Sequence, residues 1–181
     1  VLHPCPTRRS ADLSGRNTAP CIAYASYRIA ETVPDANIVV APSDHIILKE
    51  DDFVEVIKTA LKTVENNDWL LTLGIRPSRP DTGYGYIQFL DDVLEGTDKR
   101  IKKVKTFTEK PNLELARTFL ASGDFLWNAG IFNWNLNSIL QALSQYLPDV
   151  DEVFKSGKGL YNTPRERSEE RRVGKECRSR W

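Results

Sequence analysis

Apolar positions along the chain alternate between short continuous runs and helical repeats. Residues 37–41 and 69–75 are apolar runs rich in β-branched and leucine side chains, and each run predicts a buried strand. Between the two runs, residues 51–68 place six apolar side chains on one helical face: Phe53, Val56, Ile57, Ala60, Leu61 and Val64. A strand, a helix and a second strand joined by long crossovers are typical of a parallel sheet covered on both faces. The pattern therefore predicts an α/β fold.

A further helix is predicted before the first strand. Thr18 is a candidate cap, and Pro20 suits the first turn. Apolar residues at helical spacing follow and predict the buried face: Ile22, Ala25, Ile29 and Val33. Pro34 ends this helix.

The pattern is looser beyond Ile75. Residues 76–86 are rich in Pro and Gly, and they are followed by two predicted strands, GYIQFL at 85–90 and RIKKVKTFTEKP at 100–111. A helix is expected over 112–124, begun by Pro111 or Asn112 and ended by Gly123. A strand-like segment, FLWNAGIFNW, precedes a last predicted helix that either Asn135 or Asn137 caps.

Composition is that of a soluble globular protein, with 40% hydrophobic and 28% charged residues in 181. No apolar run is long enough for a membrane span, which needs about 18 residues. The 13 residues at the N-terminus lack the apolar centre of a secretory signal. The cysteines form no disulfide framework and no zinc spacing, so we expect a cytoplasmic protein.

The two ends differ from the rest of the chain. Residues 167–181, RSEERRVGKECRSRW, fit neither helical nor strand periodicity. They resemble the translation of a common sequencing adapter, and PTRRSADL near the N-terminus resembles the opposite adapter. We therefore expect a non-native leader at 1–13, a partial domain at 14–166 and a non-native, disordered tail at 167–181. The alternative for the tail is a charged, solvated segment.

Removing the ends changes the charge of what remains. The leader carries a net charge of +1 and residues 165–181 carry +3, so residues 14–164 carry about −4 while the whole chain is neutral. An acidic core argues against nonspecific binding of nucleic acid.

Asp44 is the first candidate for chemistry, because it follows the predicted strand at 37–41. Ligands of open α/β sheets bind outside the carboxyl ends of the strands. A carboxylate there suits Mg²⁺, which one or two carboxylates and substrate phosphates usually hold. The alternative is that Asp44 caps a turn and that His45 is a packed neighbour.

Five motifs occur in order along the chain: RNTAP (16–20), PSDH (42–45), GYGYI (83–87), FTEKP (107–111) and WNAGIF (127–132). Together they resemble the mannose-1-phosphate guanylyltransferases, within the sugar nucleotidyltransferase family. The resemblance implies a Rossmann-like nucleotidyltransferase fold with a mostly parallel sheet, here truncated at both ends. It also implies the transfer of GMP from GTP to mannose 1-phosphate, giving GDP-mannose and pyrophosphate. The partners it implies are these two substrates, with no nucleic acid, no membrane and a possible homo-oligomer of the intact parent.

The family implies that Asp44 ligates Mg²⁺ and that Lys110 contacts the sugar phosphate, both as catalytic residues. Glu109 is expected to accept hydrogen bonds from sugar hydroxyls, and Asn128 to donate to the hexose and accept from it. The remaining expected contacts are glycines of the sugar site, Gly83, Gly85 and Gly130, and two residues near the nucleobase, Arg16 and Asn17. Gly83 and Gly85 lack a Cβ and so permit a close approach of the backbone.

Each role has a plainer alternative. Lys110 and Glu109 could form an ordinary surface pair, Gly83 and Gly85 could serve only a turn, and Arg16 could be solvated. Trp127 and Phe132 are expected to pack in the core, and Tyr84 and Tyr86 are undecided.

The chain departs from the family pattern in two respects. It has no loop of the form GGxGxRLWPLSR, which cradles the triphosphate, and no second metal-binding Asp far downstream. We therefore expect this polypeptide to be inactive alone. Other nucleotide-sugar pyrophosphorylases, such as glucose-1-phosphate thymidylyl- and uridylyltransferases, share EKP and NAG-like elements, although PSDH with RNTAP favours the mannose and guanosine branch. A noncatalytic, regulatory copy of the fold is the alternative from another class.

Overall fold

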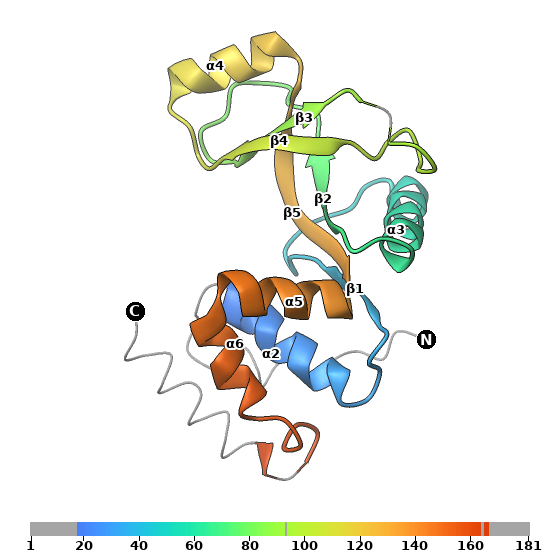
Figure 1. Cartoon of the computed structure of the whole chain (residues 1–181). Coiled ribbons are helices and arrows are strands. Elements are labelled where there is room, and N and C mark those ends of the chain that lie inside the picture. Colours follow the sequence, from blue (N-terminus) through green and yellow to red (C-terminus); the bar gives the residue numbers. More distant parts are fainter. Residues whose placement is uncertain (1–17, 93, 164, 167–181) are drawn as a thin grey trace. The chain divides into compact units, whose positions relative to one another are not determined.

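A computed structural model of the chain describes residues 18–92, 94–163, 165 and 166 (Figure 1). Its helices are α2 (Thr18–Ala30), α3 (Glu50–Glu65), α4 (Leu113–Ser122), α5 (Leu136–Tyr146) and α6 (Pro148–Lys155). Its strands are β1 (Asn37–Val40), β2 (Leu70–Ile75), β3 (Tyr86–Leu90), β4 (Lys103–Thr108) and β5 (Phe125–Asn135). The chain divides into two compact units, Ile38–Trp134 and the flanking segments up to Asn37 and from Asn135.

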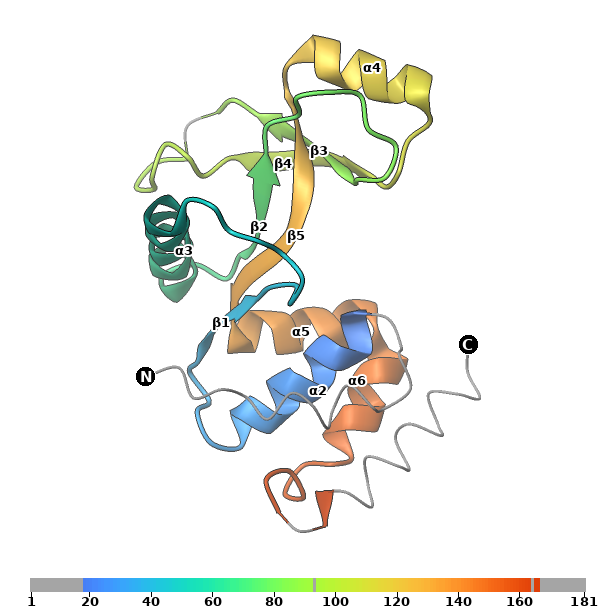
Figure 2. The ribbon, with the colours of Figure 1, turned by 180° about the vertical axis from the view of Figure 1, so that it is seen from behind.

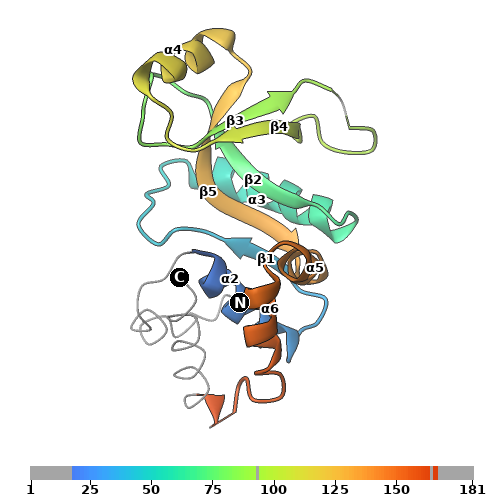
Figure 3. The same cartoon turned by 60° about the vertical axis from the view of Figure 1, so that its left-hand side comes forward.

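The unit Ile38–Trp134 is built on the sheet. Four of the five strands pair in the order β1-β5-β3-β4, and the fifth strand, β2, pairs with β5. Figure 3 shows β3 and β4 side by side as a hairpin, and Figures 1 and 2 show α3 beside β2. β5 is 11 residues long, where the sequence indicated only a short strand-like segment, and it borders three other strands.

The α/β nucleotidyltransferase architecture is as expected, but the strand directions are not. Each pairing of known register, β2 with β5, β3 with β5 and β3 with β4, is antiparallel, whereas a mostly parallel sheet was expected. Parallel neighbours need a crossover of a dozen or more residues, usually helical. The chain has such a crossover at α3, but the described residues between β2 and β3 and between β3 and β4 form no helix. The expectation of a parallel sheet came from the strand–helix–strand pattern of residues 37–75, and it does not hold for the strands beyond Ile75.

The two apolar runs form strands that are less buried than expected. The residues of β1 alternate between exposed and half-buried, and Leu70 and Ile75 at the ends of β2 are each 51% exposed. A continuous apolar run indicates burial only where both faces of the sheet are covered. The described residues cover these strands only in part.

One hydrophobic cluster joins β3 and β5 of the sheet to α4. Tyr86, Ala116, Phe125 and Trp127 form this cluster, and Phe119 of α4 packs against it. The rings of Phe119 and Phe125 stack with centroids 3.9 Å apart.

The ends of α4 are set by local signals. Its N-terminus is capped by Asn112, whose side chain accepts a hydrogen bond from the Leu115 N–H at 2.9 Å. Gly123 ends the helix at φ 79°, a left-handed conformation that favours glycine. Both boundaries were predicted.

The flanking unit packs α2, α5 and α6 together (Figure 1). α5 begins at the predicted cap Asn135, which accepts a hydrogen bond from the N–H of Asn137. The predicted buried face of α2 is wrong, because the helix buries Ala23, Ser26 and Tyr27 instead. The Tyr27 hydroxyl donates to the carboxylate of Asp151 in α6, so the buried face of α2 includes a polar contact that the apolar pattern does not indicate.

α6 was not predicted. Pro148 occupies the first turn of α6, where its missing N–H has no partner to lose. None of the described helices is both long and apolar enough to cross a bilayer.

Candidate functional site

Three predicted residues from distant parts of the sequence meet around Gly85. The backbone N–H of Asn128 donates to the Gly85 carbonyl oxygen at 2.8 Å, which holds the segment before β3 against β5. A Cβ on Gly85 would stand 2.7 Å from Glu109 Oε2 and 2.9 Å from the Phe107 ring. Gly85 is therefore required for this close approach, and it brings Glu109 beside the backbone that Asn128 contacts.

Lys110 joins this group through Glu109. Its Nζ lies 3.6 Å from Glu109 Oε1, and the two side chains are 64% and 58% exposed. A pair this exposed contributes little to stability. Both charged groups therefore remain accessible from solvent, as a binding role requires.

The backbone of Lys110 is in an unusual conformation. Its φ is 43°, in the left-handed region, although Lys carries a Cβ and precedes a proline. Such a residue costs about 1–3 kcal/mol and persists only where its surroundings impose it. Here the next residues are fixed, because Pro111 is buried and Asn112 caps α4. Strain of this kind is concentrated at binding and catalytic sites.

The side chain of Asn128 is held by two hydrogen bonds to one atom. Its Oδ1 accepts from the Thr72 hydroxyl at 2.9 Å and from the Gly130 N–H at 3.1 Å. Both lone pairs of the amide oxygen are therefore engaged within the protein. The expectation that Asn128 also accepts from the hexose does not fit this arrangement, which leaves the amide NH₂ as the group that can reach a ligand.

Gly130 connects β5 with the segment that carries Asp44. Its φ is 67°, and a Cβ at Gly130 would lie 3.6 Å from Cγ of Pro42. Pro42 belongs to the PSDH motif that follows β1, and Asp44 lies two residues further, in an exposed turn. His45 is exposed as well, so the interpretation of His45 as a packed neighbour is wrong.

The loop before Gly85 is ordered by Asp81. Asp81 Oδ1 accepts from the Gly83 N–H at 2.8 Å, and Oδ2 lies 2.7 Å from Nη2 of Arg79. The Gly83 N–H, and after it Arg79, hold the pKa of the Asp81 carboxyl below its ordinary value. Gly83 thus has a clear role in the turn, and its predicted contact with a sugar stays a prediction.

Aromatic residues border the same loop. The Tyr84 ring lies 5.0 Å from the ring of Trp127, and the Arg79 guanidinium lies 5.5 Å from the Trp127 centroid. Trp127 is only 8% exposed and belongs to the core cluster, in agreement with the sequence analysis. Tyr86 is fully buried, and its hydroxyl donates to the Asp81 carbonyl oxygen at 2.9 Å.

Sequence reasoning missed Thr72, Arg79 and Asp81. Thr72 was hidden in the apolar run WLLTLGI, where one hydroxyl among aliphatic residues is the signal that could have found it. Arg79 and Asp81 stand in the Pro- and Gly-rich segment that was interpreted only as a loop. Arg16 and Asn17, the leader at 1–13 and the tail at 167–181 lie outside the described residues.

Asp44 is the one predicted metal ligand. It forms no hydrogen bond or ion pair with the other described residues, and these contain no cluster of three or more His, Cys, Asp or Glu side chains that could hold a metal ion. A lone exposed carboxylate can serve as one oxygen ligand of Mg²⁺ if phosphates and water supply the others. The residues fit that arrangement and do not fit a metal held by protein side chains alone.

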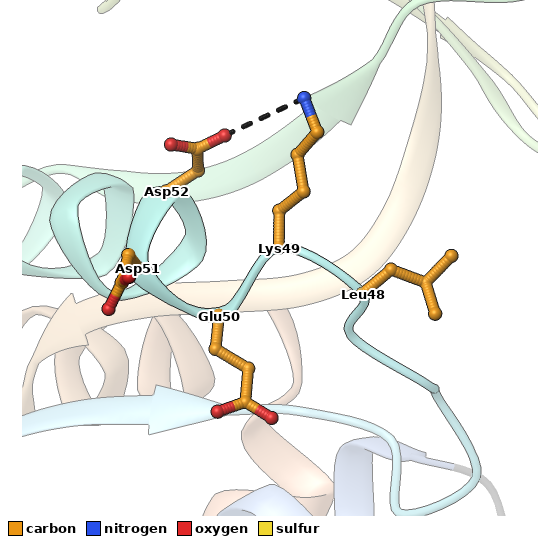
Figure 4. A pocket seen from close by; sticks show the side chains of 5 residues that line it. All are labelled: Leu48, Lys49, Glu50, Asp51 and Asp52. Carbon is orange, nitrogen blue, oxygen red and sulfur yellow. Dashed lines mark ion pairs between the residues drawn. The ribbon is translucent and has the colours of Figure 1, made fainter.

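A hollow at the start of α3 is not the candidate site. Five consecutive residues line it, Leu48, Lys49, Glu50, Asp51 and Asp52, and Figure 4 shows their side chains with Lys49 paired to Asp52. Three acidic side chains in the first turn suit the helix dipole. They would repel a phosphate, so the hollow is unsuited to a nucleotide or a sugar phosphate.

Comparison with known proteins identifies relatives of this chain. Residues 6–159 match the family model described as nucleotidyl transferase. A mannose-1-phosphate guanylyltransferase of Escherichia coli is 40% identical over 143 residues, which cover 77% of this chain and 30% of that protein. The chain thus spans about 30% of the length of the curated relatives it matches.

Two solved structures resemble the chain. A Thermus thermophilus protein described as a mannose-1-phosphate geranyltransferase has a TM-score of 0.69 and 27% identity, covering 78% of this chain and 40% of that one. A Helicobacter pylori protein described as a mannose-6-phosphate isomerase has a TM-score of 0.63 and 30% identity, with coverages of 77% and 49%.

Proposed function

The chain belongs to the nucleotidyl transferase family, and from this premise we propose that it is part of an enzyme that makes GDP-mannose from GTP and mannose 1-phosphate. One observation carries the proposal: Gly85, Glu109 and Asn128 meet at one place, with the Lys110 ammonium beside them. The guanylyltransferases among the relatives support the choice of sugar and nucleotide.

The reaction joins two anions. A phosphate oxygen of mannose 1-phosphate attacks the α-phosphorus of GTP, a new P–O bond forms, and the bond to the β-phosphate breaks to release pyrophosphate. Positive charge and a fixed in-line geometry are what a protein must supply for such a step. Lys110 would bind the sugar phosphate as a point charge, and its constrained backbone would fix the place from which this side chain extends.

The sugar would be held from two sides. The Glu109 carboxylate can only accept hydrogen bonds, which suits the hydroxyl donors of a hexose. The Asn128 NH₂ can only donate, which suits a hexose oxygen. Gly83, Gly85 and Gly130 would border the sugar without side chains, and Arg16 with Asn17 would serve the nucleobase.

Mg²⁺ would be held by Asp44 together with substrate phosphates, where it would neutralise the charge of the reacting phosphates. The proposal is supported by the neighbouring Pro42, which lies against Gly130 and precedes Asp44 by two residues. Because the described residues offer a single carboxylate there, we expect the chain to bind Mg²⁺ only weakly without a phosphate ligand.

The test is calorimetric titration of the 181-residue chain with mannose 1-phosphate. Lys110→Ala should weaken binding by about 10- to 100-fold, because a hydrogen bond to a charged group contributes about 1.5–3 kcal/mol. The matched control is Lys103→Ala, which removes the same charge from an exposed position of β4. It should change the affinity less than about twofold, as for other exposed charges.

Three outcomes would contradict the proposal. Absence of saturable binding would remove the sugar-phosphate site from this chain. Equal losses in the two lysine variants would mean nonspecific attraction of an anion. Tighter binding of glucose 1-phosphate than of mannose 1-phosphate would favour another nucleotide-sugar pyrophosphorylase.

A further inference from the structure

Thr72 faces the candidate site from β2, and nothing in the chemistry above requires it. We propose that Thr72 is a positioning residue that fixes the side-chain amide of Asn128 so that only its NH₂ is presented to the ligand. The proposal rests on the function proposed above for its ligand, a sugar phosphate. The orientation of the amide itself follows from contacts within the protein.

The orientation of the Asn128 amide follows from the backbone N–H of Gly130, a group that cannot accept a hydrogen bond. The backbone N–H of Gly130 can only donate, so the atom that it meets at 3.1 Å must be the amide oxygen. The Thr72 hydroxyl, 2.9 Å from the same oxygen, then donates its proton there. Its other acceptor, the Ile131 carbonyl oxygen, is more distant at 3.4 Å. The Gly130 N–H excludes the flipped amide, which would place an NH₂ against it. The Thr72 hydroxyl adds a second hydrogen bond to the same oxygen and so holds the amide in this orientation.

The local strand geometry explains why a residue of β2 can reach Asn128. In the pairing of β2 with β5, Thr72 is opposite Phe132 and Gly74 is opposite Asn128, with a shift of register between them. Such an irregularity re-aims a side chain from its regular direction. A β-branched residue is stiff at χ1, so the hydroxyl is held at this place with little loss of entropy.

The fixed amide limits what ligand the site accepts. Among the described residues none accepts a hydrogen bond from Nδ2, so its two N–H groups remain for a ligand. Asn128 then selects an oxygen that can accept, while Glu109 selects a hydroxyl that can donate. A hexose has both kinds of group at fixed spacing. A site of this kind discriminates against an analogue that lacks the matching oxygen, because the half-buried NH₂ of Asn128 would lose its partner.

The experiment reads the amide directly, by the side-chain NH₂ resonances of Asn128 in the ¹⁵N-labelled 181-residue chain. These resonances are assigned by their disappearance in Asn128→Asp. Thr72→Val removes the hydroxyl while it retains the size of the side chain, and should shift both resonances and speed the rotation of the amide. It should also weaken binding of mannose 1-phosphate by about 3- to 10-fold, the value of one neutral hydrogen bond. Thr72→Ser should restore both properties to within about twofold of wild type.

The matched control is Thr106→Val, which removes an exposed β4 hydroxyl whose acceptor is Gln88 Oε1 at 3.3 Å. It should leave the Asn128 resonances and the affinity unchanged. Wild-type resonances and affinity in Thr72→Val would overturn the proposal. Failure of Thr72→Ser to restore them would also overturn it, since the methyl group would then be the group that matters.

The two proposals fail in different ways. If Thr72→Val shifts the Asn128 resonances but the wild-type chain binds no mannose 1-phosphate, the positioning role is correct and the proposed function is wrong. If the chain binds mannose 1-phosphate but Thr72→Val moves neither the resonances nor the affinity, the proposed function stands and Thr72 has no positioning role.

Discussion

Lys110 combines a charged side chain with a backbone conformation that favours glycine. If the left-handed φ of 43° is imposed by the turn into Pro111 and α4, glycine should fit the turn better than any residue with a Cβ.

We therefore predict that Lys110→Gly is more stable than Lys110→Ala by about 1 kcal/mol. Urea unfolding of the two variants measures the difference. Both variants should lose the affinity for mannose 1-phosphate equally, because both lack the ammonium group. An alanine variant as stable as the glycine variant would show that the conformation carries no strain.

Sequence could indicate the residue types of the site but not all of its contacts. Short motifs predicted Glu109, Lys110, Gly85 and Asn128 for the candidate site. In the structure Gly85 contacts Asn128 and approaches Glu109, and Lys110 lies beside Glu109, while their roles stay predictions. A short motif shows the type of each residue and therefore the kind of group that its side chain can bind. The Thr72 contact depends on a register shift between two strands that are far apart in sequence, and no local pattern encodes such a shift.

At the scale of helices and strands, the sequence predicted the helix ends, which depend on neighbouring residues, but not the strand directions, which depend on tertiary contacts. The caps Asn112 and Asn135 and the terminator Gly123 were found because they act within one turn of their own helix. Strand direction depends on which strands become neighbours, so the antiparallel pairings around β5 were not predicted.

The buried face of α2 could not be predicted either, because its stability depends on a contact with another helix. The interior position of Tyr27 is stabilised by Asp151, a residue of α6. Burial opposes ionisation of Asp151, but hydrogen bonds from Lys155 and Tyr27 outweigh it and keep the pKa of Asp151 below its ordinary value. Burial, and then the bond to Asp151, raise the pKa of Tyr27 well above its ordinary value.

We predict from these shifts that the α2–α6 packing weakens at alkaline pH. Burial also raises the pKa of Tyr161, so both phenols stay protonated in the folded chain while the unfolded chain ionises near pH about 10. The unfolded state then binds fewer protons, and the free energy of unfolding falls as pH rises through that value. Urea unfolding midpoints from about pH 8 to pH 11 measure the effect.

Tyr27→Phe should reduce the slope of this alkaline loss and should cost about 1–3 kcal/mol at neutral pH, since buried Asp151 loses a donor. The control Tyr146→Phe removes a hydroxyl from a residue that is 72% exposed and should behave as wild type. An unchanged alkaline slope in Tyr27→Phe would show that this phenol is not a source of the pH dependence.

At the scale of the whole molecule, the chain contains more candidate residues for binding mannose 1-phosphate than for binding the triphosphate of GTP. The residues expected to bind mannose 1-phosphate all lie in the unit Ile38–Trp134. The 181 residues contain no glycine-rich loop of the GGxGxR form, whose backbone N–H groups would face a triphosphate.

We predict that the 181-residue chain binds mannose 1-phosphate but does not make GDP-mannose by itself. Loss of one preorganised donor costs about 10²–10³ in rate, and a missing loop removes several. Pyrophosphate release with GTP, Mg²⁺ and mannose 1-phosphate should equal that of a control without protein. Release above that control, abolished by Asp44→Asn, would show that the 181 residues suffice for turnover and would exclude a noncatalytic copy of the fold.

The central position of β5 gives the two sides of the proposed site different freedom. Asn128 stands on a strand with neighbours on both edges, so its position is settled when the sheet folds. Glu109 and Lys110 stand on an exposed turn, where side chains lose rotamer freedom only when a ligand arrives, at about 1–2 kcal/mol for each long chain. Substitutions that restrict the rotamers of these two side chains can therefore tighten binding without adding a contact to the ligand. Asn128 is already held in β5, so no comparable gain is expected there.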